Sequence, residues 1–338
     1  AFTAAASGRA GPAALLLPAD LLRAPCGTPA LPRALSLGNW PLDRTRPSDA
    51  DIRKAAELIA QARAPVVVAG GGVHCAGATE ELSRLQEEAS LPVYTTNMGK
   101  GAVDEFHPLS LGVLGALTGP RSLGWYSQAL ISEADLVVLI GTRTNQNGTD
   151  SWRQIPAGAK VIHIDVDPCE IGRNYEALRL AGDARETIAA LRNALSALDL
   201  SVRHAARAEL EARISGFWSR FEADRLPFSS SINSPIRPER LMAELQTFLS
   251  PDVTVVADAS YSSMSILGQL RSVGAGTRFI TPRDLAGLGW SIEHGNEPAN
   301  AAIAAGAVAG LTALDLSCAK GPDAEQVPVV ECDYTARS

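Results

Sequence analysis

Residues 64–73 read APVVVAGGGV, an apolar run rich in valine that leads directly into three glycines. Valine favours strands, and a strand without polar alternation is typical of a parallel sheet that is covered on both faces. Gly70, Gly71 and Gly72 allow a tight turn from the strand into a following helix. The stretch therefore predicts a strand–turn–helix unit of an α/β fold.

Units of the same kind occur on both sides of this stretch. Before it, Ser48 can cap a helix whose apolar stripe includes Ile52, Ala55 and Ile59. After it, strands are predicted at LPVYTT (91–96), ADLVVLIGTRT (134–144) and KVIHIDVD (160–167), and helices at ATEELSRLQEEAS (78–90) and DARETIAALRNALSAL (183–198). We therefore predict a doubly wound parallel-sheet domain over residues 48–198.

The flanking sequence indicates parts of other domains. PAALLLPADLL (12–22) predicts a buried strand that needs neighbours on both faces, so we expect residues 1–23 to be the remnant of a preceding domain. Residues 24–47 are rich in proline and read as a linker. Residues 199–234 are charged, helical in their first half, and read as a connector. Residues 235–338 read as an incomplete second α/β unit.

That last unit contains four predicted elements: a helix at RPERLMAELQTFL (237–249), and strands at DVTVVADAS (252–260), RFITP (278–282) and VPVVECDY (327–334).

Composition narrows the class of protein. A length of 338 residues fits two or three domains. A net charge of −7 argues against a nucleic-acid-binding surface or an anionic-membrane surface, and the sequence has no apolar run of about 18 residues that would span a membrane. Five scattered cysteines without a C-x-x-C pair predict reduced thiols in a cytoplasmic protein.

Three predicted loops carry candidate binding residues at one edge of the sheet. They contain the glycine turn at Gly70–Gly72, the pair Gly141 and Arg143, and the pair Asp165 and Asp167. Such loops can hold the phosphates and ribose of a nucleotide, although the sequence G-x-G-x-x-G is not matched. A tight structural turn is the alternative for each glycine, and His74, His107 and His163 nearby are expected to be hydrogen-bonded scaffold residues.

A second candidate site is VVADASYSS, residues 255–263. Asp258, Ser260, Tyr261 and Ser262 follow a predicted buried strand, and hydroxyl and N–H groups in that position suit an anionic ligand. A capped turn without a ligand explains the same pattern equally well.

These stretches together resemble a known family. PVVVAGGGV, LPVYTTNMGKGAVDEFHPLSLGVLG, ADLVVLIGTRTN and AKVIHIDVDPCEIGRN are similar to the central domain of the thiamine-diphosphate-dependent enzymes, within the acetolactate synthase-like large (catalytic) subunit group. SGRAGPAALLLPADLL resembles the last strand of the family's N-terminal, pyrimidine-binding domain. SPIRPERLMAELQTFLSPDVTVVADAS and DLAGLGW resemble the start of its C-terminal, diphosphate-binding domain.

The resemblance implies a three-domain enzyme that decarboxylates a 2-oxo acid and joins the product to an acceptor. It implies thiamine diphosphate as the electron sink and Mg²⁺ on the diphosphate. Because family cofactor sites lie between subunits, it also implies a homodimer or homotetramer.

The resemblance assigns roles by position. Ser260, Tyr261 and Ser262 match the loop that meets the diphosphate, and Gly287 and Leu288 match the turn that holds the cofactor bent. The acetolactate synthase branch also binds FAD in the central domain. The positions that match its lining are Gly71, Gly72, Thr96, Met98, Gly141, Arg143, Asp165 and Asp167. GTRTNQNG here replaces the branch's usual GARFDDR, which counts against FAD.

Two features depart from the family pattern. The 338 residues contain no G-D-G motif for Mg²⁺ and no segment with the glutamate that activates the cofactor, so no catalytic residue is assigned. SIEHGNEPAN (291–300) also follows GLGW where the family has an apolar helix. One hypothesis is that the residues are joined pieces of a longer enzyme, which a long Cα–Cα distance at Trp290–Ser291 would show.

The alternative to that hypothesis is a degenerate, non-catalytic module that binds FAD or an adenine nucleotide. An NAD-dependent oxidoreductase is a third and weaker hypothesis, because it depends on the glycine turns alone.

Overall fold

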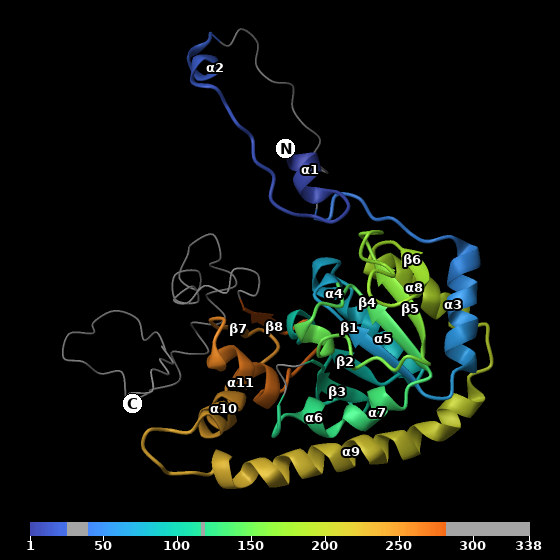
Figure 1. The fold of residues 1–338 in the computed structure, drawn as a ribbon, viewed down its shortest axis with the longest axis vertical. Coiled ribbons are helices and arrows are strands. Elements are labelled where there is room, and N and C mark those ends of the chain that lie inside the picture. The colour runs from blue at the N-terminus through green and yellow to red at the C-terminus, as the bar shows by residue number, and fades with distance from the viewer. Residues whose placement is uncertain (26–39, 116–118, 282–338) are drawn as a thin grey trace, which may run out of the picture.

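A six-stranded parallel sheet is the centre of the computed structural model, which describes residues 1–25, 40–115 and 119–281 (Figure 1). Its strands are β1 (Pro65–Ala69), β2 (Val93–Thr95), β3 (Ser110–Val113), β4 (Leu136–Ile140), β5 (Lys160–Asp165) and β6 (Leu178–Ala181). They lie in the order β3-β2-β1-β4-β5-β6, and every neighbouring pair is parallel. The predicted α/β fold class is therefore confirmed.

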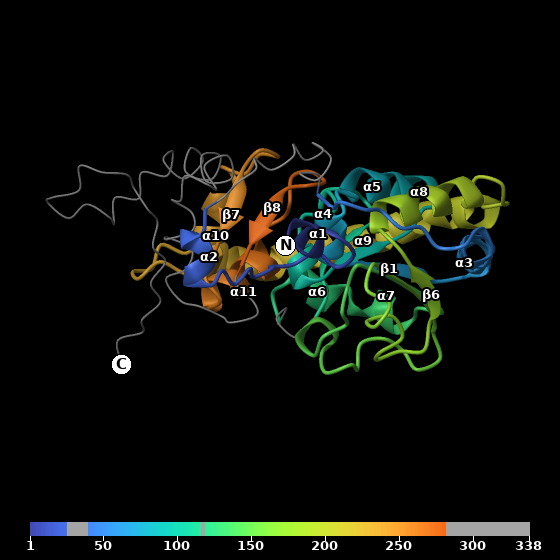
Figure 2. The same cartoon turned by 90° about the horizontal axis from the view of Figure 1, so that it is seen from above.

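Helices cover both faces of the sheet. α3 (Asp49–Gln61), α5 (Thr79–Glu88) and α8 (Ala184–Leu195) lie over one face, and α6 (Leu123–Tyr126) and α7 (Gln128–Ser132) over the other (Figure 2). The middle of α9 (Ser201–Ser229) packs into the same core as α7. Strand β1 shows why its sequence has no polar alternation. Val67 and Ala69 enter the core on the α3 side, whereas Val66 and Val68 enter the core on the α9 side.

Polar side chains fix where two of these helices begin. Ser48 caps α3, since its Oγ accepts a hydrogen bond of 3.2 Å from the N–H of Asp51, as the sequence predicts. Asp183 caps α8 in the same way and also accepts a hydrogen bond of 2.9 Å from Arg44. Because Arg44 is thereby anchored to α8, the end of the predicted linker packs on the sheet domain.

The predicted N-terminal strand at residues 12–22 is wrong for this structure. Helices α1 (Phe2–Ala6) and α2 (Ala19–Arg23) are present instead, and no strand lies between them. Leu15, Leu16 and Leu17 are exposed by 68%, 90% and 55%. A strand needs a neighbour to take its backbone hydrogen bonds, and no strand in the described part of the chain pairs with this segment.

Helix α9 is longer than the sequence predicts. It was expected to cover only the first half of the connector, but it runs without interruption from Ser201 to Ser229 and contains Pro227. Ile214 and Phe221 are almost fully buried, and Ile214 packs in the core beneath the sheet. The segment is therefore part of the helical layer on this face as well as the link to the next unit.

The C-terminal unit begins after α9. It consists of α10 (Pro238–Gln246), β7 (Thr254–Val256), α11 (Tyr261–Gln269) and β8 (Arg278–Ile280), with β7 and β8 parallel. Its small core includes Leu241, Ile266 and Phe279. The predicted helix and the first two strands are confirmed, although β7 ends two residues before Asp258. DLAGLGW, VPVVECDY and the Trp290–Ser291 bond fall outside the described residues.

Replacing Ile214 with alanine tests whether α9 belongs to the core. We expect a loss of about 2–5 kcal/mol in the free energy of unfolding, because the substitution leaves a cavity beneath the sheet. Val202→Ala on the same helix is the matched control. Val202 is 84% exposed, so its loss should stay within about 0.5 kcal/mol. Equal small losses in urea denaturation would show that α9 is only a connector.

Candidate functional site

The carboxyl ends of β1 and β4 meet at the point where the strand order reverses. In doubly wound sheets this is the usual position of a ligand crevice. Here the two turns are in direct backbone contact, because Gly72 N–H donates to the Gly141 carbonyl at 3.0 Å. A Cβ atom at Gly70 would lie 2.3 Å from that same oxygen, and Gly141 has a φ of +59°. The glycines are therefore required for packing between the turns.

The helix that follows the glycine turn is short. Helix α4 (Gly72–Cys75) has only four residues, and the N–H groups of Val73 and Cys75 donate to the carbonyls of Gly70 and Gly71. These donors are used within the turn, so they are not directed at a ligand. Of the two interpretations that the sequence leaves open, the contacts favour a structural turn.

The aspartates after β5 also make local hydrogen bonds. Asp165 accepts from the N–H of Asp167, and Asp167 accepts from the N–H of Cys169, both at 2.9 Å. The second carboxylate oxygen of Asp167 accepts from Arg9 at 3.2 Å. Burial raises the pKa of Asp165, whereas the Cys169 N–H and then Arg9 lower the pKa of Asp167. Together these bonds shape the loop after β5 and tie residue 9 to it.

Three other residues match the family's FAD site: Thr96 lies buried in a turn, whereas Met98 and Arg143 are exposed. Thr96 is buried, and its hydroxyl accepts from Gly99 N–H at 3.2 Å. Met98 is 46% exposed and lies against Gly71, where a Cβ atom would be 3.1 Å from its own. Arg143 is exposed. The structure thus brings Gly71, Gly72, Gly141 and Met98 together. The polar side chains of Thr96, Asp165 and Asp167 instead form hydrogen bonds within their own loops.

The three histidines are hydrogen-bonded, as expected of scaffold residues. His74 Nε2 is 3.0 Å from the Lys100 carbonyl, and His163 Nε2 is 2.9 Å from the Thr142 carbonyl. Each carbonyl can only accept, so each Nε2 donates. Burial lowers the pKa of His74 and His163, which favours the neutral ring. His107 instead pairs with Glu87 at 2.9 Å.

The second candidate site is the turn that begins α11. Ser260 is the N-cap, with its Oγ accepting from Ser262 N–H at 3.2 Å, and the two hydroxyl oxygens are 2.7 Å apart. The side chains of both serines are partly exposed, and Tyr261 is 75% exposed. The cap that the sequence allowed is present, and hydroxyl groups remain at the surface. Gly287 and Leu288 lie outside the described residues.

A buried ion pair was missed by the sequence interpretation. Lys100 Nζ lies 2.8 Å from Glu105 Oε2, and the two side chains are 1% and 2% exposed. Lys100 also donates to the Leu270 carbonyl at 2.7 Å, which joins the sheet domain to the C-terminal unit. The available signal was the opposite charges at the two ends of KGAVDE, residues 100–105.

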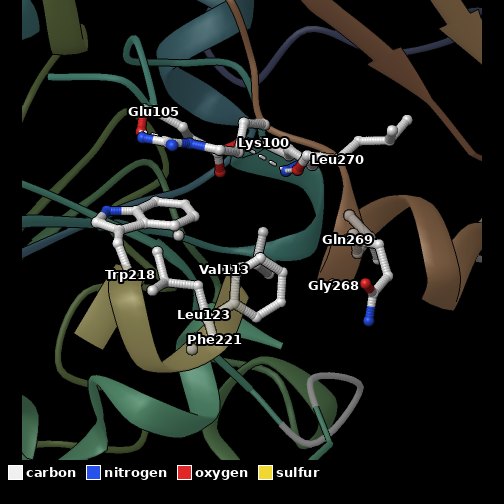
Figure 3. Close-up of a pocket in the computed structure, with 13 residues that line it drawn as sticks. Lys100, Glu105, Val113, Leu123, Trp218, Phe221, Gly268, Gln269 and Leu270 are labelled. Atoms are coloured by element: carbon white, nitrogen blue, oxygen red, sulfur yellow. Dashed lines mark hydrogen bonds and ion pairs between the residues drawn. The ribbon is translucent and has the colours of Figure 1, made fainter. Parts of the chain in front are cut away.

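The ion pair lines a cavity with room for about one water molecule. Figure 3 shows Glu105, Lys100 and Leu270 along one wall, with Trp218 and Phe221 opposite them. The cavity is too small for a cofactor, so it is part of the joint between the units.

The described residues contain no group of three or more His, Cys, Asp or Glu side chains that could hold a metal ion. Nor does any helix in this part of the chain have the length and apolar character needed to cross a membrane.

Comparison with known proteins identifies the sheet region. Residues 52–191 match the family described as thiamine pyrophosphate enzyme, central domain. The chain is 34% identical over 253 residues to a probable acetolactate synthase large subunit of Methanocaldococcus jannaschii, covering 74% of this chain and 40% of that protein. It is 32% identical over 269 residues to an acetolactate synthase of Mycobacterium bovis, covering 78% and 41%.

The fold and this match identify residues 52–191 as a central domain of the thiamine pyrophosphate enzyme family, with β1 to β6 as its sheet. The chain belongs to the acetolactate synthase-like group of that family, as its motifs indicate. It spans about two fifths of the length of these relatives.

Gly141→Ala tests the contact between the two glycine turns. The new Cβ would lie 2.7 Å from the Gly72 Cα, and the backbone would remain left-handed, so we expect a loss of roughly 2–5 kcal/mol in the free energy of unfolding. Gly158→Ala is the control, because a Cβ there meets no atom within 4 Å; its effect should stay within about 1 kcal/mol. Similar urea midpoints for the two variants would contradict the packing role.

Proposed function

We propose that the protein is a thiamine-diphosphate-dependent enzyme that decarboxylates a 2-oxo acid and transfers the product to an acceptor, as acetolactate synthase-like proteins do. One observation carries the proposal: similarity to acetolactate synthases extends over 253 residues, well beyond the central domain matched at residues 52–191. The similarity thus reaches sequence outside the central domain. Because the chain spans 40% of that relative, the activity is proposed for the full-length protein.

The α11 turn is the proposed diphosphate site. Its two partly exposed hydroxyl groups and the start of a nine-residue helix form a donor set that suits a phosphate oxygen. Ser262 would donate to the diphosphate, and Ser260 would hold the turn by accepting from the Ser262 N–H. When bound, thiamine diphosphate supplies the electron sink for decarboxylation. Gly287 and Leu288 are proposed to support the bent cofactor on the strength of the sequence alone.

Mg²⁺ is proposed as the ion that neutralises the diphosphate. Mg²⁺ prefers carboxylate, carbonyl and phosphate oxygens, so it would bind beside the diphosphate. A homodimer or homotetramer in the cytoplasm is proposed with it, by analogy with the family.

FAD is not part of the proposal. Of the residues that match the family's FAD site, Thr96, Asp165 and Asp167 are hydrogen-bonded within the turns, and Gly72 and Gly141 pack on each other. No contact in the described residues favours FAD over these structural roles. The central domain is therefore proposed as a structural module of the enzyme.

Ser262→Ala tests the proposed diphosphate site. A lost hydrogen bond to a charged group is worth about 1.5–3 kcal/mol, so the concentration of thiamine diphosphate at half-maximal turnover of pyruvate should rise about tenfold or more. Turnover by the unchanged full-length protein should require both thiamine diphosphate and Mg²⁺.

The matched control is Ser132→Ala on α7, an exposed serine whose hydroxyl bonds only within its own helix. It should leave the cofactor requirement unchanged. A full-length protein that binds neither thiamine diphosphate nor Mg²⁺ would instead be a degenerate binding module, and the proposal would fail.

A further inference from the structure

The C-terminal end of α11 is held by two cations. The last carbonyls of a helix lack partners within the helix and carry partial negative charge. Here Arg225 from α9 donates to the Gln269 carbonyl at 3.1 Å, and Lys100 donates to the carbonyl of the C-cap residue Leu270 at 2.7 Å. The end of α11 is thereby bonded both to α9 and to the sheet domain.

Lys100 is fixed in place by Glu105. A buried ammonium group is stable only when it is paired and its hydrogen bonds are satisfied. Glu105 Oε2 accepts from Lys100 Nζ at 2.8 Å (Figure 3) and from Ser272 N–H at 2.7 Å, so the carboxylate bonds to both units. The ring centroid of Phe279 lies 5.1 Å from the ammonium and adds a cation–π contact.

The backbone on either side of the ion pair is bonded as well. Glu105 N–H donates to the Ser272 carbonyl at 3.1 Å, and the Ser272 hydroxyl donates to the Val103 carbonyl at 2.7 Å. Gly276 N–H donates to the Gly101 carbonyl at 2.8 Å. Hydrogen bonds therefore connect residues 100–105 to residues 270–277 along the length of the segment.

We propose that Lys100 and Glu105 are positioning residues for the Ser260–Ser262 turn, which is the proposed diphosphate site. Helix α11 extends from the anchored end at Leu270 to the Ser260–Ser262 turn, a distance of about 13 Å for nine residues. Because a helix this short is stiff, fixing its C-terminal end fixes the direction of its first turn. The cofactor part of this inference rests on the proposed function; the anchoring of α11 does not.

The test uses two variants of the full-length protein. Lys100→Met removes the donor to Leu270 and leaves Glu105 buried without its partner. Lys100→Met with Glu105→Gln removes both charges and keeps an acceptor for the Ser272 N–H, so this double variant should fold even if the single variant does not. Deuterium exchange by mass spectrometry reports the stability of α11, and titration calorimetry with thiamine diphosphate and Mg²⁺ reports affinity.

We expect exchange at residues 262–270 to become about tenfold faster or more, while β1 and β4 exchange as before. The Kd for thiamine diphosphate should rise about tenfold, with a smaller change in kcat at saturating cofactor. A role only in overall stability would instead speed exchange throughout the sheet. Exchange in α11 and a Kd within about twofold of the unchanged protein would overturn the proposal.

The control replaces an exposed ion pair of the same kind. Arg213→Met with Glu133→Gln removes a pair that joins α9 to α7 within the sheet domain, and it should alter neither exchange in α11 nor the Kd. If the unchanged protein does not bind thiamine diphosphate, the proposed function fails, and the exchange measurement still decides whether Lys100 and Glu105 anchor α11.

Discussion

The contact between Lys100 and Glu105 is the constraint on which the relation of the two units depends. Both side chains are almost completely buried, so each charge must be compensated within the protein. The compensation comes from both units at once, through Leu270 and Ser272. Moving the C-terminal unit away would break the bonds to Leu270 and Ser272, so these contacts help to hold the interface together.

A second group of contacts supports the ion pair from outside. The guanidinium of Arg271 donates to the Glu105 carbonyl at 2.7 Å and lies 3.6 Å from the ring centroid of Trp218 on α9. Sheet domain, α9 and C-terminal unit therefore meet at one place. The same place lies at one end of α11, whose other end carries the proposed diphosphate turn. This arrangement links the packing of the chain to its proposed chemistry.

The sequence motifs that identify the family coincide with contacts that few other residues can make. AGGG and IGT carry the glycines whose backbones touch at the switch point between β1 and β4. KGAVDE carries the buried charges and Gly101, where a Cβ would lie 1.9 Å from the Thr277 carbonyl oxygen. The glycines and charges of these motifs are thus required for packing. From the sequence alone, the two glycine turns also allowed a nucleotide-binding interpretation.

Much of the sheet could be predicted because its signals are local. Continuous valine and isoleucine runs predict β1, β4 and β5, and Ser48 and Asp183 mark helix starts by their own hydrogen bonds. Strands β3 (SLGV) and β6 (LRLA) were missed because neither contains a run of valine or isoleucine, and β6 has the exposed Arg179 within it.

Long-range features were harder to predict. The burial of Ile214 and Phe221 on α9 depends on residues far away in the chain, and charged residues lie on both sides of each in the sequence. For residues 12–22 the sequence predicted a strand that is absent. An apolar segment forms a strand only where a partner strand takes its backbone hydrogen bonds. The Lys100–Glu105 pair was missed because its burial depends on residues 270–277. The proposed diphosphate role of Ser260–Ser262 came from the family resemblance, because a capped turn alone does not reveal a ligand.

The most direct test of this account is a double-mutant cycle on Lys100 and Glu105, measured as the free energy of unfolding in urea. Each single variant, Lys100→Met or Glu105→Gln, leaves one buried group without its partner. The account predicts that the double variant loses less than the sum of the two single losses, by at least about 1 kcal/mol. Losses that add within about 0.3 kcal/mol would contradict it, because they would show that the two charges do not stabilise each other.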